Sequence, residues 1–191
     1  MDIQKENTAS LQPRPNSDLS IVENPLEWLK SFQQGWLAHF EKTGEPDWKV
    51  YTRPRNQFAP SGPGVNLAES RLFLISSSGG YLPNEQEPFD ANNILGDYSI
   101  RVLPSNTPLS AIKYAHTHYD HKYVDADPQV LLPLKHLDDM VDEGKIGEIA
   151  PVFVSFSGYH PNVIRVVKET VPAIIKVAKE HRVQAALLVP V

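Results

Sequence analysis

The sequence predicts an α/β domain of three layers, with a mostly parallel sheet and helices on both of its faces. Several short segments are continuously apolar, which is typical of strands that are buried on both faces of a parallel sheet. They include LFLI (72–75), PVFVSF (151–156) and AALLVPV (185–191), and segments of helical spacing separate them. The length of 191 residues, with 41% apolar and 21% charged side chains, suits one globular domain.

Residues 1–20 are polar and lack periodicity, so we expect a disordered or loosely attached arm there. A single α/β domain should then occupy residues 21–191. Its first helix is predicted from Pro25 to Lys42, with Asn24 as its cap and Glu27 completing a capping box. Helical spacing assigns its buried face to Leu26, Leu29, Phe32, Trp36 and Phe40.

Prolines make residues 45–68 irregular, and the remaining elements follow in order. Strands are predicted at 72–75, 99–103 and 111–115, followed by a short helix that Gly144 ends. After the strand PVFVSF comes a long helix within residues 161–181, which Pro172 should kink. Its shared apolar face is predicted to contain Val163, Val167, Val171, Ile174 and Ala178. The apolar strand AALLVPV completes the predicted sheet.

Composition excludes several classes of function. A net charge of −5 argues against nucleic-acid binding, and no apolar run reaches the length of about 20 residues that a membrane span needs. The first 20 residues lack the apolar core of a signal peptide, so we expect a cytoplasmic protein. Without any cysteine, these residues contain no disulfide, thiolate metal site or cysteine nucleophile.

The densest group of chemically capable side chains is HTHYDH, which contains His116, His118, Asp120 and His121. It follows a predicted strand, and functional loops of α/β sheets gather at the carboxyl ends of strands. Imidazole and carboxylate groups there are candidates for acid–base catalysis. The alternative is a polar loop whose side chains bond backbone groups and cap the next helix.

Two further loops follow predicted strands and should reach the same edge of the sheet. SSSGG offers the hydroxyls of Ser77 and Ser78 and the amide of Gly79 as an anion cradle, although it lacks a P-loop lysine. SFSGYHP places Gly158 and His160 just before a helix, where an anionic ligand would be favoured. Simple turns are the alternative in both places.

A metal site is a second interpretation of HTHYDH. Its H-x-H-x-D-H spacing occurs in metallo-β-lactamase-type hydrolases, where metal-bound water is the nucleophile. That fold needs a later bridging aspartate, whereas the last aspartate of this chain is Asp142. We therefore predict that His116, His118 and Asp120 hold one divalent ion, but not a pair.

Several blocks together resemble one family. GDYSIRVLP, HTHYDHKYVDADPQVLLPLKHLDDMVDEGKIG, FVSFSGY and AALLVPV occur in the order seen in the glycine/sarcosine/betaine reductase component B and D-proline reductase selenoprotein family, over roughly residues 71–191. The resemblance implies an oligomeric, cytoplasmic reductase subunit of anaerobic amino-acid metabolism that acts on a small amino acid or amine. It also implies a partner subunit whose pyruvoyl group activates the substrate amine.

In that family a selenocysteine or cysteine attacks the substrate and a carbon–nitrogen bond is cleaved reductively. The nucleophile follows the strand that reads AALLVPV here, but this sequence stops at Val191 and has no cysteine. The chain as given therefore cannot perform that chemistry alone. Our hypothesis is that it is truncated at a UGA codon, which would leave an apolar groove beside the last strand. A naturally short, non-catalytic partner subunit is the alternative.

Overall fold

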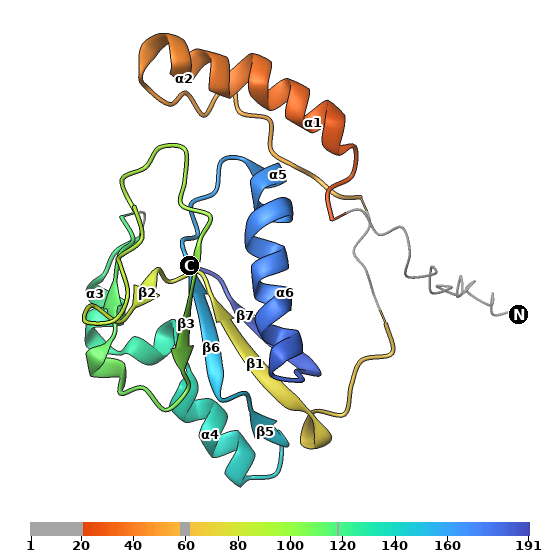
Figure 1. The fold of residues 1–191 in the computed structure, drawn as a ribbon, viewed down its shortest axis with the longest axis vertical. Helices are drawn as coiled ribbons and strands as arrows, with labels where there is room; N and C mark the ends of the chain where they lie inside the picture. The colour runs from red at the N-terminus through yellow and green to blue at the C-terminus, as the bar shows by residue number, and fades with distance from the viewer. Residues whose placement is uncertain (1–20, 58–61, 118) are drawn as a thin grey trace, which may run out of the picture.

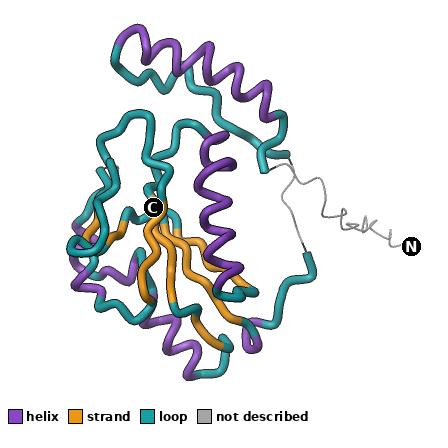
Figure 2. The backbone as a smooth tube through the Cα atoms, in the orientation of Figure 1, coloured by secondary structure: helices purple, strands orange, loops and turns teal. Residues whose placement is uncertain are grey.

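The computed structural model describes residues 21–57, 62–117 and 119–191. Its centre is a five-stranded sheet formed by β1 (Arg71–Ser76), β3 (Ile100–Pro104), β5 (Glu148–Ile149), β6 (Val152–Phe156) and β7 (Ala185–Val189). Figures 1 and 2 show helices on both sides of this sheet, which confirms the predicted α/β class. The predicted arm, residues 1–20, lies outside the described residues.

Strand β1 lies in the middle of the sheet and is parallel to β5, β6 and β7. Its longest pairing is with β7, from Leu72 opposite Ala185 to Ser76 opposite Val189. Strand β3 is antiparallel to β6 and starts one residue later than predicted. The sheet is therefore mixed but mostly parallel, and the carboxyl ends of β1, β6 and β7 lie together.

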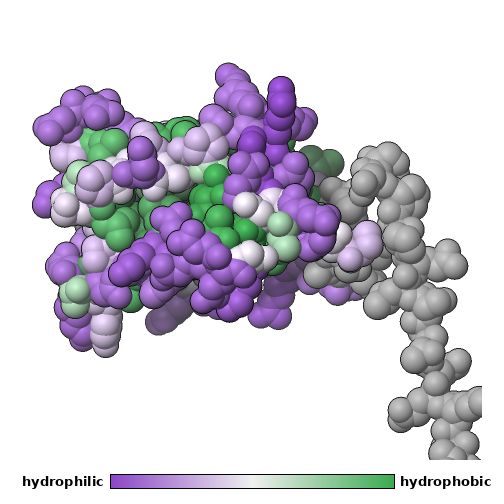
Figure 3. Space-filling view, turned by 90° about the horizontal axis from the view of Figure 1, so that it is seen from below, coloured by the Kyte–Doolittle hydropathy of each residue, from purple (hydrophilic) through white to green (hydrophobic). Residues whose placement is uncertain are grey.

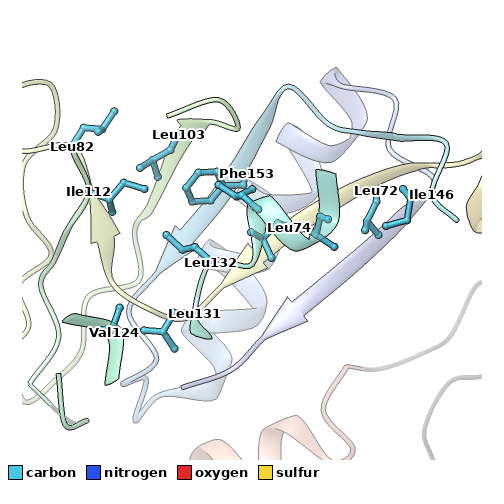
Figure 4. Packing of buried hydrophobic residues seen from close by; sticks show 12 residues of the cluster. Leu72, Leu74, Leu82, Leu103, Ile112, Val124, Leu131, Leu132, Ile146 and Phe153 are labelled. Atoms are coloured by element: carbon cyan, nitrogen blue, oxygen red, sulfur yellow. The ribbon is translucent and has the colours of Figure 1, made fainter. Parts of the chain in front are cut away.

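The two faces of β1 belong to two different hydrophobic clusters. Leu72 and Leu74 pack with Phe153 and with residues of the helical segments from Lys122 to Asp142 (Figure 4). Phe73 and Ile75 pack on the other face with Val177 of the last helix. Burial on both faces explains why the strand has a continuous apolar sequence.

The first helical segment consists of α1 (Pro25–Phe32), the π-helical turn η1 (Gln33–Leu37) and α2 (Ala38–Thr43). The predicted capping box is wrong: Asn24 has a left-handed backbone, and its side chain makes no cap hydrogen bond. Leu26 is also wrongly assigned to the buried face, because it is 81% exposed, whereas Trp28 is buried.

Four aromatic rings, from Trp28, Phe32, Trp36 and Phe40, stack along this segment, with centroids 5.1, 5.6 and 5.8 Å apart. A spacing of four residues exceeds the 3.6-residue α-helical turn, so such rings would drift around an ideal α-helix. The wider π turn keeps them on one face. Tyr51 packs on the stack and donates a 2.9 Å hydrogen bond to the carbonyl of Pro161. The segment is thereby held at the carboxyl edge of the sheet.

The last helix is also interrupted, as α5 (Val163–Arg165), the π turn η5 (Val166–Thr170) and α6 (Val171–Glu180). The π turn ends two residues before Pro172. Proline has no backbone N–H, so it cannot donate a hydrogen bond to a carbonyl of the preceding turn. Within the predicted apolar face, Ile174 and Ala178 pack against the sheet, and Val177 joins them. Val163 instead packs against the aromatic stack.

Shorter elements complete the chain. The predicted strand at 111–115 is only β4 (Lys113–Tyr114), which pairs with β2 (Gly80–Tyr81) in a separate antiparallel ribbon. Helix α4 (Leu134–Asp142) is followed by Gly144, as predicted. The sequence patterns missed α3 (Lys122–Ala126) and the 3-10 turns η2 (Leu67–Glu69), η3 (Leu109–Ala111) and η4 (Pro128–Val130).

The surface seen from the end opposite α1 and α2 is mainly hydrophilic, with hydrophobic residues showing between the hydrophilic ones (Figure 3). Within the described ranges, every helix is too short or too polar to cross a lipid bilayer.

Candidate functional site

The three loops predicted to converge do meet at the carboxyl edge of the sheet. A methyl group placed on Gly158 would lie 3.3 Å from Nε2 of His116 and 3.3 Å from Oγ of Ser77. His116 comes from the loop after β4, Ser77 from the loop after β1, and Gly158 from the loop after β6. His116 and Ser77 are both buried. The loops thus bring an imidazole, a hydroxyl and a glycine backbone into one place.

Gly79 makes this approach possible. Its φ is +70°, and a Cβ added to it would lie only 2.6 Å from the carbonyl oxygen of Ala115. Its own backbone donates to Phe156 (3.0 Å) and accepts from Ala115 (2.9 Å). Because a side chain fits neither the dihedral nor the space, glycine is required here for the HTHYDH segment to dock on the sheet.

Ser77 connects the end of β1 with the end of β7. Its backbone amide donates to the carbonyl of Val189 (3.1 Å), and its hydroxyl accepts from the amide of Val191 (2.9 Å). The chain leaving β7 is therefore held beside the hydroxyl that adjoins His116 and Gly158. This contact was not predicted, because it joins residues 114 positions apart.

Ser78 is fully buried beneath the loop. Its hydroxyl is 3.3 Å from that of Ser155 and accepts from the amide of Gly80 (3.3 Å), while its own amide donates to Ser76. These contacts use the side chain to hold the loop together. Ser155 was not predicted as part of the site, because it lies within the predicted strand PVFVSF.

Tyr119 is a second missed member of the site. Its ring lies between those of His116 and His121, with centroids 4.7 and 4.5 Å away, and it is parallel to His121 within 7°. Burial raises the pKa of its phenol. The protonated hydroxyl donates to the carbonyl of Ser78 (3.2 Å), so Tyr119 pins the segment to the serine loop. The sequence HTHYDH gives no signal that distinguishes Tyr119 as a site residue.

His121 and Asp120 have local partners. Nε2 of His121 is 2.6 Å from the carbonyl oxygen of His116, which can only accept, so this nitrogen carries the proton. Asp120 is exposed and forms a 2.8 Å ion pair with Lys122. A hydrogen bond from the Lys122 side chain, and a second from its backbone, hold the pKa of Asp120 below its ordinary value. These contacts match the polar-loop alternative for this end of the segment.

The predicted metal ligands are only partly visible, because His118 lies outside the described residues. Across residues 21–57, 62–117 and 119–191, no three His, Asp or Glu side chains gather as a metal site would require. The single-ion site at His116, His118 and Asp120 therefore stays a prediction.

The ring of His160 stacks on those of Tyr98 (4.7 Å) and Phe156 (5.7 Å). Its Nε2 donates to the carbonyl of Asp97 (2.8 Å), and burial lowers its pKa. Arg101 bonds the hydroxyl of Ser99, which in turn bonds Asp97. His160 therefore orders the loop from Asp97 to Ser99.

Comparison with known proteins identifies relatives of the chain. Residues 49–190 match the family described as glycine/sarcosine/betaine reductase selenoprotein B (GRDB). The chain is 27% identical over 122 residues to the D-proline reductase subunit gamma of Acetoanaerobium sticklandii, covering 64% of this chain and 49% of that protein.

It is also 30% identical over 117 residues to the sarcosine reductase complex component B subunit beta of Peptoclostridium acidaminophilum, covering 60% of this chain and 27% of that protein. The matched part thus spans about half of one relative and a quarter of the other. No solved structure matches the chain.

Proposed function

Because the chain belongs to the glycine/sarcosine/betaine reductase selenoprotein B family, we propose that it is part of a reductase-complex subunit that cleaves a carbon–nitrogen bond of a small amino acid or amine. The observation that carries the proposal is the meeting of Ser77, His116 and Gly158 at the carboxyl edge of the sheet. We expect the complex to be cytoplasmic and oligomeric, with a pyruvoyl-bearing partner subunit.

A selenolate or thiolate supplies the nucleophile in this chemistry, and none is present among the 191 residues. As it bonds to the substrate carbon, the carbon–nitrogen bond breaks, and the nitrogen leaves with the electron pair and needs a proton. His116 is the candidate proton donor, because it is a buried imidazole at the point where the loops that carry Ser77 and Gly158 meet.

The other residues of the site have supporting roles in this proposal. Ser77 holds the chain that leaves β7 beside His116 through its bond to the Val191 amide. Gly158 lets its loop pack closely against the imidazole, and Gly79 lets the segment approach. Asp120 has a lowered pKa and is ionised at neutral pH, so it is a poor proton donor.

The test uses the full natural polypeptide that contains these residues, affinity-tagged and purified from an anaerobic host with its partners. We expect a carbonyl-bearing subunit, detected by reaction with a hydrazine, to co-purify. When a dithiol is supplied, we also expect the complex to release ammonia or an amine from glycine, sarcosine or betaine, or to open the ring of D-proline, whose nitrogen stays attached to the product. Co-purification without cleavage of any of these four would favour a non-catalytic partner subunit. If no such partner is recovered and no substrate is cleaved, the proposal fails.

The hydrolase alternative is separated by elemental analysis of protein purified without chelator. Two equivalents of a divalent metal, together with ester or lactam hydrolysis, would replace the reductase proposal. One equivalent would support the single-ion prediction for His116, His118 and Asp120. No metal, even after metal addition, would leave the acid–base role or the polar loop.

A further inference from the structure

A cavity of about 330 Å³ adjoins the candidate site. Two of the residues that line it are sequence neighbours of site residues, since Thr117 follows His116 and Tyr159 follows Gly158. The whole lining consists of Pro46, Trp48, Ala91, Asn92, Asn93, Ile94, Thr117 and Tyr159. The cavity therefore lies next to the loops that carry His116 and Gly158.

Hydrogen bonds tie the walls of the cavity to the site. The hydroxyl of Thr117 donates to the carbonyl of Ala91 (3.0 Å), and that of Tyr159 donates to the carbonyl of Ile94 (3.0 Å). The loop over residues 91–94 is thus fastened to both of the loops that carry His116 and Gly158. The cavity is consequently a built feature with a defined position relative to the site.

The chemistry of the lining favours a cation. The rings of Trp48 and Tyr159 stand almost at right angles, 82°, with centroids 5.8 Å apart, and form an aromatic corner. Trp48 is still 48% exposed although it packs against three rings. Aromatic faces attract ammonium groups, and none of the described lining residues is Lys or Arg. The side-chain oxygen of Asn92 adds a neutral acceptor, whereas that of Asn93 already accepts from the amide of Leu95 (3.0 Å).

We propose that this cavity binds a small organic ammonium group and that Trp48 sets the selectivity for it. The assignment of the cavity as a subsite for the substrate amine rests on the proposed function. Its assignment as a cation site depends only on the residues that line it. Pro46 and Trp48 lie outside residues 49–190, the part that matches the family. This wall of the cavity is therefore supplied by the segment that the family match does not include.

The first test compares two probes of the same shape, choline and its neutral isostere 3,3-dimethylbutan-1-ol. Both are titrated into the 191-residue chain by calorimetry. We expect saturable binding of choline that is about 5- to 10-fold tighter than that of the alcohol, because only choline gains the cation–π attraction. Equal affinities, or no saturable binding of choline, would overturn the proposal.

The second test locates the site through the three tryptophan indole N–H signals in NMR spectra. The Trp48 signal should shift on adding choline. That of Trp28, which donates to the carbonyl of Thr52, should not, and it serves as an internal reference. A shift of Trp28 with Trp48 unmoved would place the binding elsewhere.

Variants then test the role of the ring. Trp48→Leu should abolish the preference for choline over the alcohol. Trp48→Phe keeps a smaller ring and should retain part of the preference, with a ratio of the two affinities of about 2- to 3-fold. Tyr123→Leu removes an exposed ring outside the lining and should change nothing. Unchanged selectivity in folded Trp48→Leu or Trp48→Phe would refute the assignment. Because these assays need neither partner nor nucleophile, their failure is distinct from failure of the reductase proposal.

Discussion

The two ends of the segment from His116 to His121 differ in what surrounds them. His116 is buried against Ser77 and Gly158, which come from other strands of the fold. Asp120 and His121 contact Lys122 and the carbonyl of His116, which are their own neighbours in sequence. One end is placed by the tertiary structure, whereas the other stabilises its own loop.

The difference shows why a dense cluster of polar residues is not by itself a site. Local partners satisfy a side chain without bringing it to other functional groups. Contacts with distant segments, in contrast, fix a group where a substrate can meet several of them at once. The comparison predicts that substitutions at the two ends have unequal effects on catalysis.

The largest effect should follow from His116→Gln in the purified complex. Loss of the proton donor should slow amine release by about 10²- to 10⁴-fold, while the amide side chain still fills the space. The rate is measured under substrate saturation, and the thermal unfolding midpoint checks the fold. If folded His116→Gln keeps more than a fifth of the rate of amine release, the proposed functional difference between His116 and the Asp120–His121 end of the segment is wrong.

Gly79→Ala tests the contact that brings the His116 end to the sheet. The unfavourable dihedral and the 2.6 Å approach to the carbonyl of Ala115 should lower the free energy of unfolding by about 2–4 kcal/mol. Urea denaturation measures the change. Gly144→Ala is the matched control, because it shares a φ of +70° but has nothing within 4 Å. It should lose only about 1 kcal/mol, and equal losses would show that the close approach is unimportant.

His121→Leu should have a mainly structural effect. Loss of the bond to the carbonyl of His116 and of the stack on Tyr119 should lower the free energy of unfolding by about 1 kcal/mol. His121→Phe keeps a ring for the stack, so the difference between the two variants isolates the ring contact. A fall in amine release as large as that of His116→Gln would make His121 part of the catalytic group.

Asp120→Asn should have the smallest effect, with amine release unchanged within about 2-fold, because the exposed pair with Lys122 is solvent-screened. Its pKa is lowered from 3.8, so what the pair contributes to stability is present above that value and lost as the pH falls through the lowered one. NMR titration should show this lowered pKa, and Lys122→Ala should bring it back toward 3.8. No change in the Lys122→Ala protein would contradict the pairing.

The long elements of the fold were predictable because their residues share one environment along several turns or pleats. Strands β1 and β6 read as apolar runs since both of their faces are covered. Strand β7 is equally apolar in sequence, although one of its faces is open and Leu188 is 66% exposed. Strands β2, β4 and β5 have two residues each, which is too short for any periodicity to identify.

The meeting of the loops could be predicted from strand ends, but the role of each side chain could not. Ser77 and Ser78 are adjacent and identical in type, yet one adjoins His116 while the other is enclosed beneath the loop. That choice depends on contacts with residues such as Ser155 and Val191, which are far away in the sequence. Likewise, Leu26 was predicted to be buried but is exposed, whereas Trp28, which was not named in the prediction, is buried and stacks on Phe32.

The position of β1 has a consequence for biosynthesis. This strand is central, but all of its partners come late, and Arg71 bonds to Gln184, which is 113 positions further on. At about 5–20 residues per second, a ribosome needs roughly 6 to 23 seconds to make that interval. β5, the first of these partners, begins at Glu148, 77 positions after Arg71, so β1 has no strand to pair with for about two thirds of that interval. Its pairing with β7 has to wait for the whole of it. We therefore expect the nascent chain to be prone to aggregation until translation has passed β7, and slowing elongation there should lower the yield of folded protein.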